Sequence, residues 1–150
     1  MEYKLDSKDK KILGVLKEHG DYTTREIAKK TLIPFTTINN RIRKLKQEGF
    51  IKKFTIELDH DKIARGFVVY VLISADLKYL KEKNKTQYDV AKELKKFDSV
   101  ERVDIVSGET DIVAIVRVKD VKEFDNFLLE KIHSIDGVAN TKSMIVIHEC

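Results

Sequence analysis

The chain has 150 residues, of which 42% are hydrophobic and 36% are charged, with 29 Lys and Arg against 25 Asp and Glu. This balance is typical of a soluble globular protein and argues against a disordered one. No apolar run approaches the ~18 residues of a membrane span, and the N-terminus lacks the apolar core of a secretion signal, so we expect a cytoplasmic protein. Cys150 is the only cysteine, which excludes an intrachain disulfide and a multi-cysteine zinc site.

Basic residues are concentrated in the first part of the chain. Residues 1–65 contain 16 Lys and Arg and 10 Asp and Glu, a net charge of +6. Residues 66–150 contain 13 basic and 15 acidic residues, a net charge of −2. Positive charge confined to one region favours a polyanion as the partner of that region, and a solvated lysine-rich surface is the alternative.

Two short helices are predicted before residue 32. Asp6 can cap the first, which ends near Gly20, where glycine suits a helix C-terminus. Thr23 and Glu26 have the spacing of a capping box and predict the start of the second helix.

A third helix is predicted over residues 34–47, because proline is tolerated at a helix N-terminus. Ile38, Ile42 and Leu45 follow i, i+4, i+7 spacing and form one apolar stripe. The opposite face carries amide, hydroxyl and guanidinium groups. A helix buried on one side and polar on the other, after a tight turn, predicts a helix-turn-helix unit that places this helix in the major groove of double-stranded DNA.

The outward face of the third helix supplies the predicted DNA contacts. Thr36, Asn40 and Arg43 are the expected base contacts, since Asn suits adenine and Arg suits guanine. Four further side chains are expected to bind phosphates, which position a protein without reading sequence. These are Arg25, Thr37, Arg41 and Lys44, and together with Thr23 they complete the predicted DNA-binding set. Arg41 lies nearer the buried flank, so a structural role is its alternative.

The connection between the two halves contains one predicted strand and a hinge. Residues 54–58 alternate apolar and polar side chains, which predicts a short strand. Residues 59–66 break this pattern and are expected to form a hinge. The domains predicted on either side are residues 1–58 and 67–150.

The second half predicts the order β-α-β-β-α-β. Its first strand, residues 67–75, is a nearly continuous apolar run rich in β-branched side chains, and residues 79–85 are expected to be a polar connection. The later elements are expected at residues 86–97 (helix), 100–107 and 111–118 (strands), 121–133 (helix) and 138–148 (strand). The order is that of a ferredoxin-like unit, an antiparallel sheet with both helices on one face, so the predicted fold class is α+β.

The first strand of this sheet is apolar on both faces. Val69 and Val71 point to one side, whereas Val68, Tyr70 and Leu72 point to the other. Because the helices cover only one face, pairing of two sheets in a homodimer is the expected solution for the other. Burial of ~1,000 Å² would contribute a gross term of about 25 kcal/mol, part of which association entropy offsets.

Five motifs follow one another along nearly the whole chain. They are Leu5-Asp6 with Asp9, Thr23-x-x-Glu26-Ile27-Ala28, Thr37-Ile38-x-x-Arg41-Ile42-x-x-Leu45-x-x-x-Gly49-x-Ile51, Ser107-Gly108-Glu109-Thr110-Asp111 and Ile135-x-Gly137-Val138. In these motifs the chain resembles the Lrp/AsnC (leucine-responsive, feast–famine) transcription regulators. It departs from the family at Leu32, Pro34 and Thr110, where a small turn residue, a hydroxyl residue and an aromatic residue are usual.

The resemblance implies a winged-type helix-turn-helix domain followed by a ferredoxin-like effector domain that dimerises and often assembles further into octamers. It also implies that an amino acid or related metabolite binds between dimers near the Gly-x-x-Asp loop. The predicted effector-binding residues are therefore Gly108, Glu109, Thr110, Asp111 and Thr141. Asp111 would bind an α-ammonium group through a charge-assisted hydrogen bond. A plain β-turn, with Gly108 at positive φ and Asp111 capping it, is the alternative.

The sequence contains no recognisable catalytic constellation, phosphate-binding loop or metal-ligand spacing. We therefore expect neither an enzyme nor a cofactor or metal site. Two alternatives to an effector-modulated DNA-binding regulator stay open. One is a regulator that uses no ligand, and the other is a metabolite-sensing module that does not bind DNA.

Overall fold

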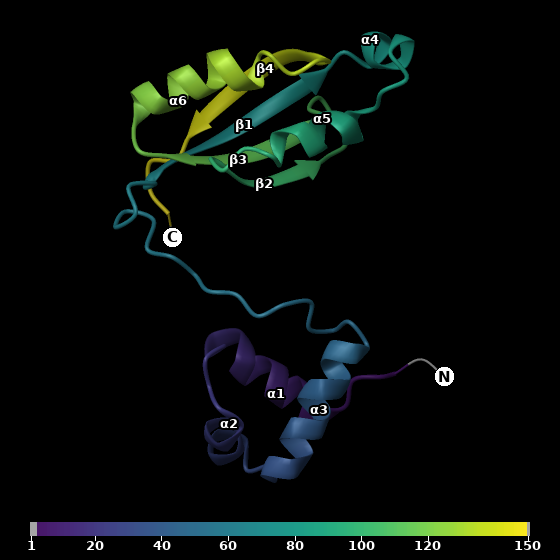
Figure 1. Cartoon of the computed structure of the whole chain (residues 1–150), viewed down its shortest axis with the longest axis vertical. Coiled ribbons are helices and arrows are strands. Elements are labelled where there is room, and N and C mark those ends of the chain that lie inside the picture. Colours follow the sequence, from purple (N-terminus) through teal and green to yellow (C-terminus); the bar gives the residue numbers. More distant parts are fainter. Residues whose placement is uncertain (1–2, 150) are drawn as a thin grey trace. The chain divides into compact units, whose positions relative to one another are not determined.

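The computed structural model describes residues 3–149 and divides into two compact units, Met1–Leu58 and Asp59–Cys150 (Figure 1). We call them the head unit and the sheet unit. Cys150, which the sequence analysis singled out, lies outside the described residues.

The head unit consists of three helices around a small apolar core. Their bounds are α1 Ser7–Glu18, α2 Thr24–Thr31 and α3 Phe35–Gln47. Asp6 and Thr23 begin α1 and α2 through the two reciprocal hydrogen bonds of a capping box, as the sequence predicts for Thr23. The core of the unit contains the buried residues Ile12, Ile27, Ile33 and Ile38, with partly buried side chains packed around them.

Asp9, a buried carboxylate, joins α1 to α3. Arg41 Nη1 donates hydrogen bonds to Asp9 Oδ1 (2.8 Å) and to Asp6 Oδ2 (2.6 Å), and Tyr3 Oη donates to Asp9 Oδ2 (2.7 Å). Burial acts to raise the pKa of Asp9, but the hydrogen bonds from Tyr3, the Asp6 amide and Arg41 outweigh it and hold that pKa below its usual value. The Asp9 amide and then Arg41 lower the pKa of Asp6 as well.

The strand predicted at residues 54–58 does not form, because the described backbone between α3 and β1 contains no strand. The alternation is present, and Phe54, Ile56 and Leu58 are all exposed. A strand needs a neighbour to accept and donate its backbone hydrogen bonds, and the sheet of this chain forms without this segment.

The sheet unit has one antiparallel sheet with the strand order β2-β3-β1-β4. Its elements in chain order are β1 Phe67–Ala75, α4 Leu77–Glu82, α5 Gln87–Leu94, β2 Val100–Ile105, β3 Ile112–Val118, α6 Val121–Phe127, the π-helical turn η1 Leu128–Ile132 and β4 Val138–Ile145. Apart from α4 and η1, this is the predicted β-α-β-β-α-β order of a ferredoxin-like unit.

Helix α4 replaces part of the predicted polar connection. Asp76 caps it by accepting a hydrogen bond from the Tyr79 amide (2.9 Å), and Leu80 is buried. With one buried side chain, α4 has too little apolar periodicity to be recognised in sequence. Gly137 is needed beneath it, because its φ is +88° and a Cβ there would lie 2.3 Å from Leu80 Cδ2.

Residues 59–66, the predicted hinge, are attached to the sheet unit. Arg65 Nη1 donates to the Asp98 carbonyl (2.7 Å), and its guanidinium also pairs with the Asp98 carboxylate. The boundary between the two units accordingly falls between Leu58 and Asp59.

The two faces of the sheet differ. Val69, Val71 and Ile73 are fully buried in a core that includes Val90 of α5 and Phe124 of α6, and Figure 1 shows both helices on one side of the sheet.

The opposite face carries Tyr70, which is 39% exposed and pairs in register with Ile115 and Met144. We call this surface the open face. The sheet is therefore apolar on both sides, as the sequence predicts.

We expect Arg41→Met to lower the free energy of unfolding of the head unit by about 2 kcal/mol, because the buried Asp9 carboxylate would lose its cation. Chemical unfolding of the full chain followed by circular dichroism measures the change. The matched control is Arg43→Met, which removes the same charge from an exposed position and should leave the free energy of unfolding unchanged.

The pH dependence provides a second measure of the same contact. Because both aspartate pKa values are lowered in the folded head unit, their stabilisation is complete above about pH 4 and is lost as the pH falls below it. Arg41→Met should make this acid loss shallower. Equal stability and equal acid profiles for the variant and the wild type would contradict the structural role of Arg41.

Candidate nucleic-acid interface and effector site

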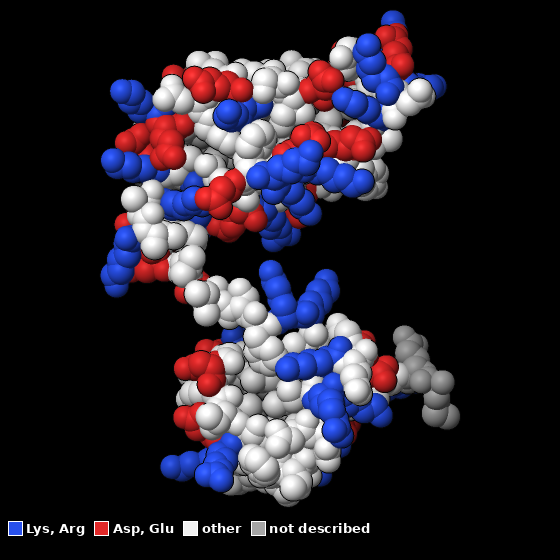
Figure 2. Space-filling model, viewed as in Figure 1, with Lys and Arg blue, Asp and Glu red and all other residues white. Residues whose placement is uncertain are grey.

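Helix α3 is buried on one side and presents a polar surface on the other. Ile38 and Leu45 are fully buried on one side of the helix. Its exposed polar side chains are Thr36, Asn39, Asn40, Arg43, Lys44, Lys46 and Gln47. Figure 2 shows Lys and Arg side chains gathered over the α3 side of the head unit. This surface offers hydrogen-bond donors, acceptors and positive charge, the groups needed to contact base edges and phosphates.

Two of the predicted base contacts lie side by side. Arg43 Nη2 donates a hydrogen bond to Asn40 Oδ1 (3.0 Å), so the amide and the guanidinium are held together one turn apart on the exposed face. Thr36 lies one turn before Asn40 on the same face. Asn39 is engaged differently, because Thr24 Oγ1 donates to its Oδ1 (2.9 Å) and so links α2 to α3.

The structure places the predicted phosphate contacts in different environments. Arg25 and Lys44 are exposed, and Lys44 Nζ lies 4.4 Å from the centroid of the Tyr3 ring. Thr37 is half-buried. Thr23 is already used as a helix cap, because its backbone N–H and its hydroxyl both donate to Glu26 (2.7 and 2.8 Å).

Arg41 differs from the other predicted phosphate contacts. Its side chain is 24% exposed and its guanidinium is occupied by Asp6 and Asp9. These contacts favour the structural alternative over the phosphate contact that the sequence predicts first. The position of Arg41 on the helix indicated this ambiguity, but the partners on α1 were not visible in the sequence.

The predicted effector loop is tied to the end of the sheet. Asp111 Oδ2 accepts a hydrogen bond from the Ala75 amide (2.8 Å), and the Asp111 amide donates to the Ile73 carbonyl (3.1 Å). Gly108 has a φ of +134°, and Glu109 is exposed. Asp111 therefore ties the loop to the end of β1, and its Oδ1 is the carboxylate oxygen that does not take part in this hydrogen bond.

Thr141 lies at the same end of the sheet but across β1 from the loop. Ile73 pairs with Thr141 on one side and with Ile112 on the other, so the two predicted site positions are separated by about two strand spacings, roughly 10 Å. The Thr141 hydroxyl is 2.9 Å from His133 Nε2. His133 follows the helical segment directly, and nothing in the sequence pattern marked it as a neighbour of this site.

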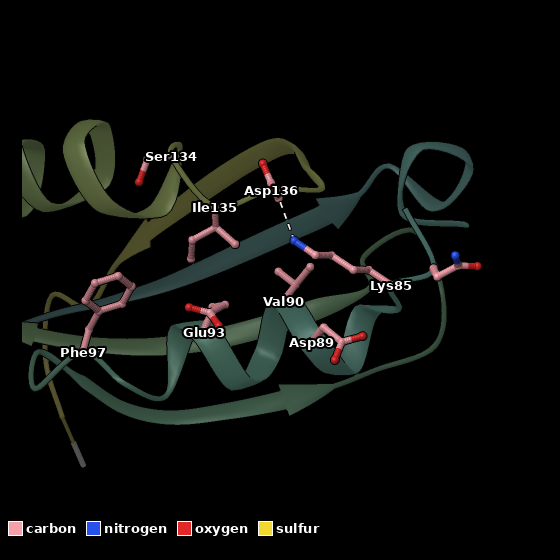
Figure 3. Close-up of a pocket in the computed structure, with 9 residues that line it drawn as sticks. Lys85, Asp89, Val90, Glu93, Phe97, Ser134, Ile135 and Asp136 are labelled. Carbon is pink, nitrogen blue, oxygen red and sulfur yellow. Dashed lines mark hydrogen bonds and ion pairs between the residues drawn. The ribbon is translucent and has the colours of Figure 1, made fainter. Parts of the chain in front are cut away.

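A separate groove of about 540 Å³ lies between α5 and the turn before β4 (Figure 3). The Lys85 side chain crosses the groove, and its Nζ lies 3.1 Å from Asp136 Oδ2. This contact raises the pKa of Lys85. Val90 and Ile135 supply apolar surface, and Phe97 lies at one end. The sequence did not indicate this groove, because its lining comes from segments that only the fold brings together.

The described residues include neither a metal-binding cluster nor a helix that could span a membrane. Within residues 3–149, no group of three or more His, Cys, Asp or Glu is arranged to hold a metal ion. None of the helices in this described part has the length and apolar character needed to cross a membrane.

Models of two protein families match the two units. The model of the Lrp/AsnC ligand-binding domain matches residues 69–150, and the model of a winged helix-turn-helix DNA-binding domain matches residues 5–52. The chain belongs to the Lrp/AsnC family. Membership confirms the predicted α+β fold and shows that the chain is a DNA-binding transcription regulator.

Relatives match this Lrp/AsnC regulator over nearly its whole length. The HTH-type transcriptional regulator FL11 of Pyrococcus horikoshii is 37% identical over 147 residues, covering 98% of this chain and 92% of that protein. An uncharacterized HTH-type transcriptional regulator of Pyrococcus furiosus is 37% identical over 141 residues, covering 94% and 91%.

Solved structures of the family also superpose on the chain. A transcriptional regulator from Neisseria meningitidis in complex with L-methionine has a TM-score of 0.87 at 26% identity and covers 97% of this chain and 92% of that one. AsnC of Escherichia coli has a TM-score of 0.83 at 23% identity, covers 98% and 95%, and supports the fold alone.

Proposed function

We propose that this Lrp/AsnC regulator is a homodimer that reads DNA sequence with α3 and responds to a small zwitterion, in the first place an amino acid. The observation that carries the proposal is the exposed Asn40–Arg43 pair on a helix held from behind by Ile38 and Leu45. Thr36, Asn40 and Arg43 contact base edges, while Arg25, Thr37 and Lys44 contact phosphates.

Charge and symmetry supply the rest of the DNA-binding geometry. The net charge of +6 on residues 1–65 attracts the duplex and makes binding depend on salt. A two-fold dimer prefers pseudo-palindromic sites whose half-sites lie about 34 Å apart or a multiple of that distance.

For DNA binding, we expect Asn40→Ala and Lys44→Met to have different effects. Asn40→Ala should weaken a selected site by about 1–3 kcal/mol and relax sequence preference, because it removes a base contact. Lys44→Met should weaken all duplexes alike and lower the slope of log affinity against log salt by about one per subunit, because it removes a phosphate contact. Fluorescence anisotropy of labelled duplexes over a salt series measures both quantities.

Either of two results would count against this assignment of α3. One is a salt slope near zero for the wild type. The other is an Asn40→Ala variant that loses the same affinity for selected and random duplexes.

The open face of the sheet supports the homodimer. Tyr70 is 39% and Met144 is 43% exposed on a face where Leu72, Val113 and Ile115 are only half-buried. A contiguous apolar surface of this kind on a soluble protein indicates an interaction site, and a two-fold axis would let the same surface serve both subunits.

Tyr70→Glu should shift the protein from dimer to monomer, raising the dissociation constant at least about 100-fold, because a carboxylate would be desolvated at the centre of the interface. Sedimentation velocity over a concentration series measures the shift. Tyr88→Glu on α5 is the matched control, since Tyr88 is 63% exposed and lies outside the open face. A Tyr70→Glu protein that sediments like the wild type would refute this interface.

The effector proposal places the zwitterion at the loop of Gly108, Glu109, Thr110 and Asp111, with Thr141 nearby. It is supported by the match to the family's ligand-binding domain and by the L-methionine complex of the Neisseria relative. The second oxygen of Asp111 offers the charge for an ammonium group. The Lys85–Asp136 groove is the competing location within the sheet unit, since it also combines both charges with apolar surface.

Calorimetric titration with the twenty amino acids, one at a time, should show heat with at least one of them. Asp111→Asn keeps an acceptor for the Ala75 amide but removes the charge, so it should weaken that binding about tenfold or more. Lys85→Ala should leave binding unchanged. The opposite pattern would move the site to the groove, and no heat in a folded sample would favour the regulator that uses no ligand.

A further inference from the structure

Leu32 connects α2 to α3 in a backbone conformation that suits few side chains. Its φ and ψ are 58° and 25°, the left-handed region, and its amide donates to the Ala28 carbonyl (2.9 Å) to end α2. Glycine or asparagine is the ordinary choice at such a helix end, because a Cβ is crowded there. The leucine is therefore strained where another residue would not be.

The leucine side chain contributes little to the core in return for this strain. Leu32 is 90% exposed, whereas Ile33, the next residue, is buried in the core of the head unit. An isolated exposed leucine is common on protein surfaces, but an exposed leucine in a left-handed backbone lacks both a conformational and a packing reason. A function of the side chain itself is the remaining reason for its presence.

The turn places Leu32 next to the N-terminal end of α3, which in the proposed docking faces the bases. The chain turns Ile33 into the core and continues with Pro34, whose ring restricts φ, before α3 begins at Phe35. Phe35 is itself 44% exposed, and Thr36, a proposed base contact, follows it.

The turn itself is uncharged from Thr31 to Thr37, and Lys29 and Lys30 lie before it in the last turn of α2. Figure 2 shows white, uncharged atoms where α2 gives way to α3, in contrast to the basic side chains along α3. The N-terminal residues of a recognition helix are the ones that approach base edges in the major groove. There the apolar group on a base edge is the 5-methyl of thymine.

We infer that Leu32 is a specificity residue that packs against a thymine methyl group in the major groove, beside the base contacts of α3. The inference rests on the proposed docking of α3 and adds to it one base preference. Exposure, strain and position then have one explanation, since the apolar side chain is covered only when DNA is bound.

The test removes the methyl group and nothing else. Duplexes that bind the full-length protein are selected from a random library, and each thymine of a half-site is then replaced in turn by deoxyuridine. At one position per half-site the replacement should weaken binding about fourfold, the effect of uncovering one buried methyl group. Replacement at that position in both half-sites should multiply the two losses.

Leu32→Asn is the decisive variant, because asparagine tolerates the left-handed backbone and the variant should melt at the same or a higher temperature. It should bind the thymine and deoxyuridine duplexes equally. Leu129→Asn, which alters a 57% exposed leucine of the sheet unit, is the matched control and should keep the fourfold difference.

Each outcome decides the matter. If the wild type does not distinguish the two bases at any position, or if Leu32→Asn still does, the inference is overturned, while selective loss of affinity in Asn40→Ala would still uphold the proposed function. If Leu32→Asn changes the sedimentation coefficient and leaves the methyl effect intact, Leu32 contacts protein and the inference is likewise overturned. If the library yields no preferred duplex, the proposed function and this inference fail together.

Discussion

The orientation of α3 depends on one buried ion pair and the apolar stripe beside it. Asp9 is held in the interior of the head unit by Arg41 and Tyr3, so the start of α1 is locked against the middle of α3. Leu45, farther along α3, is buried on the same side. Because this side of the helix is anchored, the side chains opposite it project outward as one rigid surface. The stability of the head unit and its proposed contact with DNA thus depend on opposite sides of a single helix.

The sheet unit has more apolar surface than its own helices can cover. Its helices cover one face, and we propose that a second copy of the chain covers the open face around Tyr70. Pairing through this face would supply the two-fold symmetry that a pseudo-palindromic site requires. An effector bound at the end of the sheet could then influence DNA binding by altering the assembly, since coupling between two sites requires a structure whose equilibrium both of them affect.

Much of the fold was predictable because local signals and burial agree. The capping box at Thr23, the apolar stripe of α3 and the two-sided β1 are written in residue spacing, and the structure has all three. The strand predicted at residues 54–58 was wrong and helix α4 was missed for the same reason. Residues 54–58 have the pattern of a strand but no neighbouring strand within the sheet, and α4 is fixed by one buried leucine over Gly137. Whether a strand has a partner, or a leucine lies over a glycine, depends on tertiary structure and cannot be predicted from residue spacing along the chain.

Sequence by itself determined the class of protein, the position of the third helix and the side of that helix on which polar groups lie. Tertiary structure decided what individual side chains do. Arg41 and Arg43 are identical in chemistry and two residues apart, yet one neutralises Asp9 and the other is exposed beside Asn40. Leu32 and Ile33 are adjacent and both apolar, yet one is in solvent and the other in the core. The physical reason is that residue type and spacing specify which groups can interact, whereas the charge or apolar surface opposite each side chain comes from distant segments that only folding brings near.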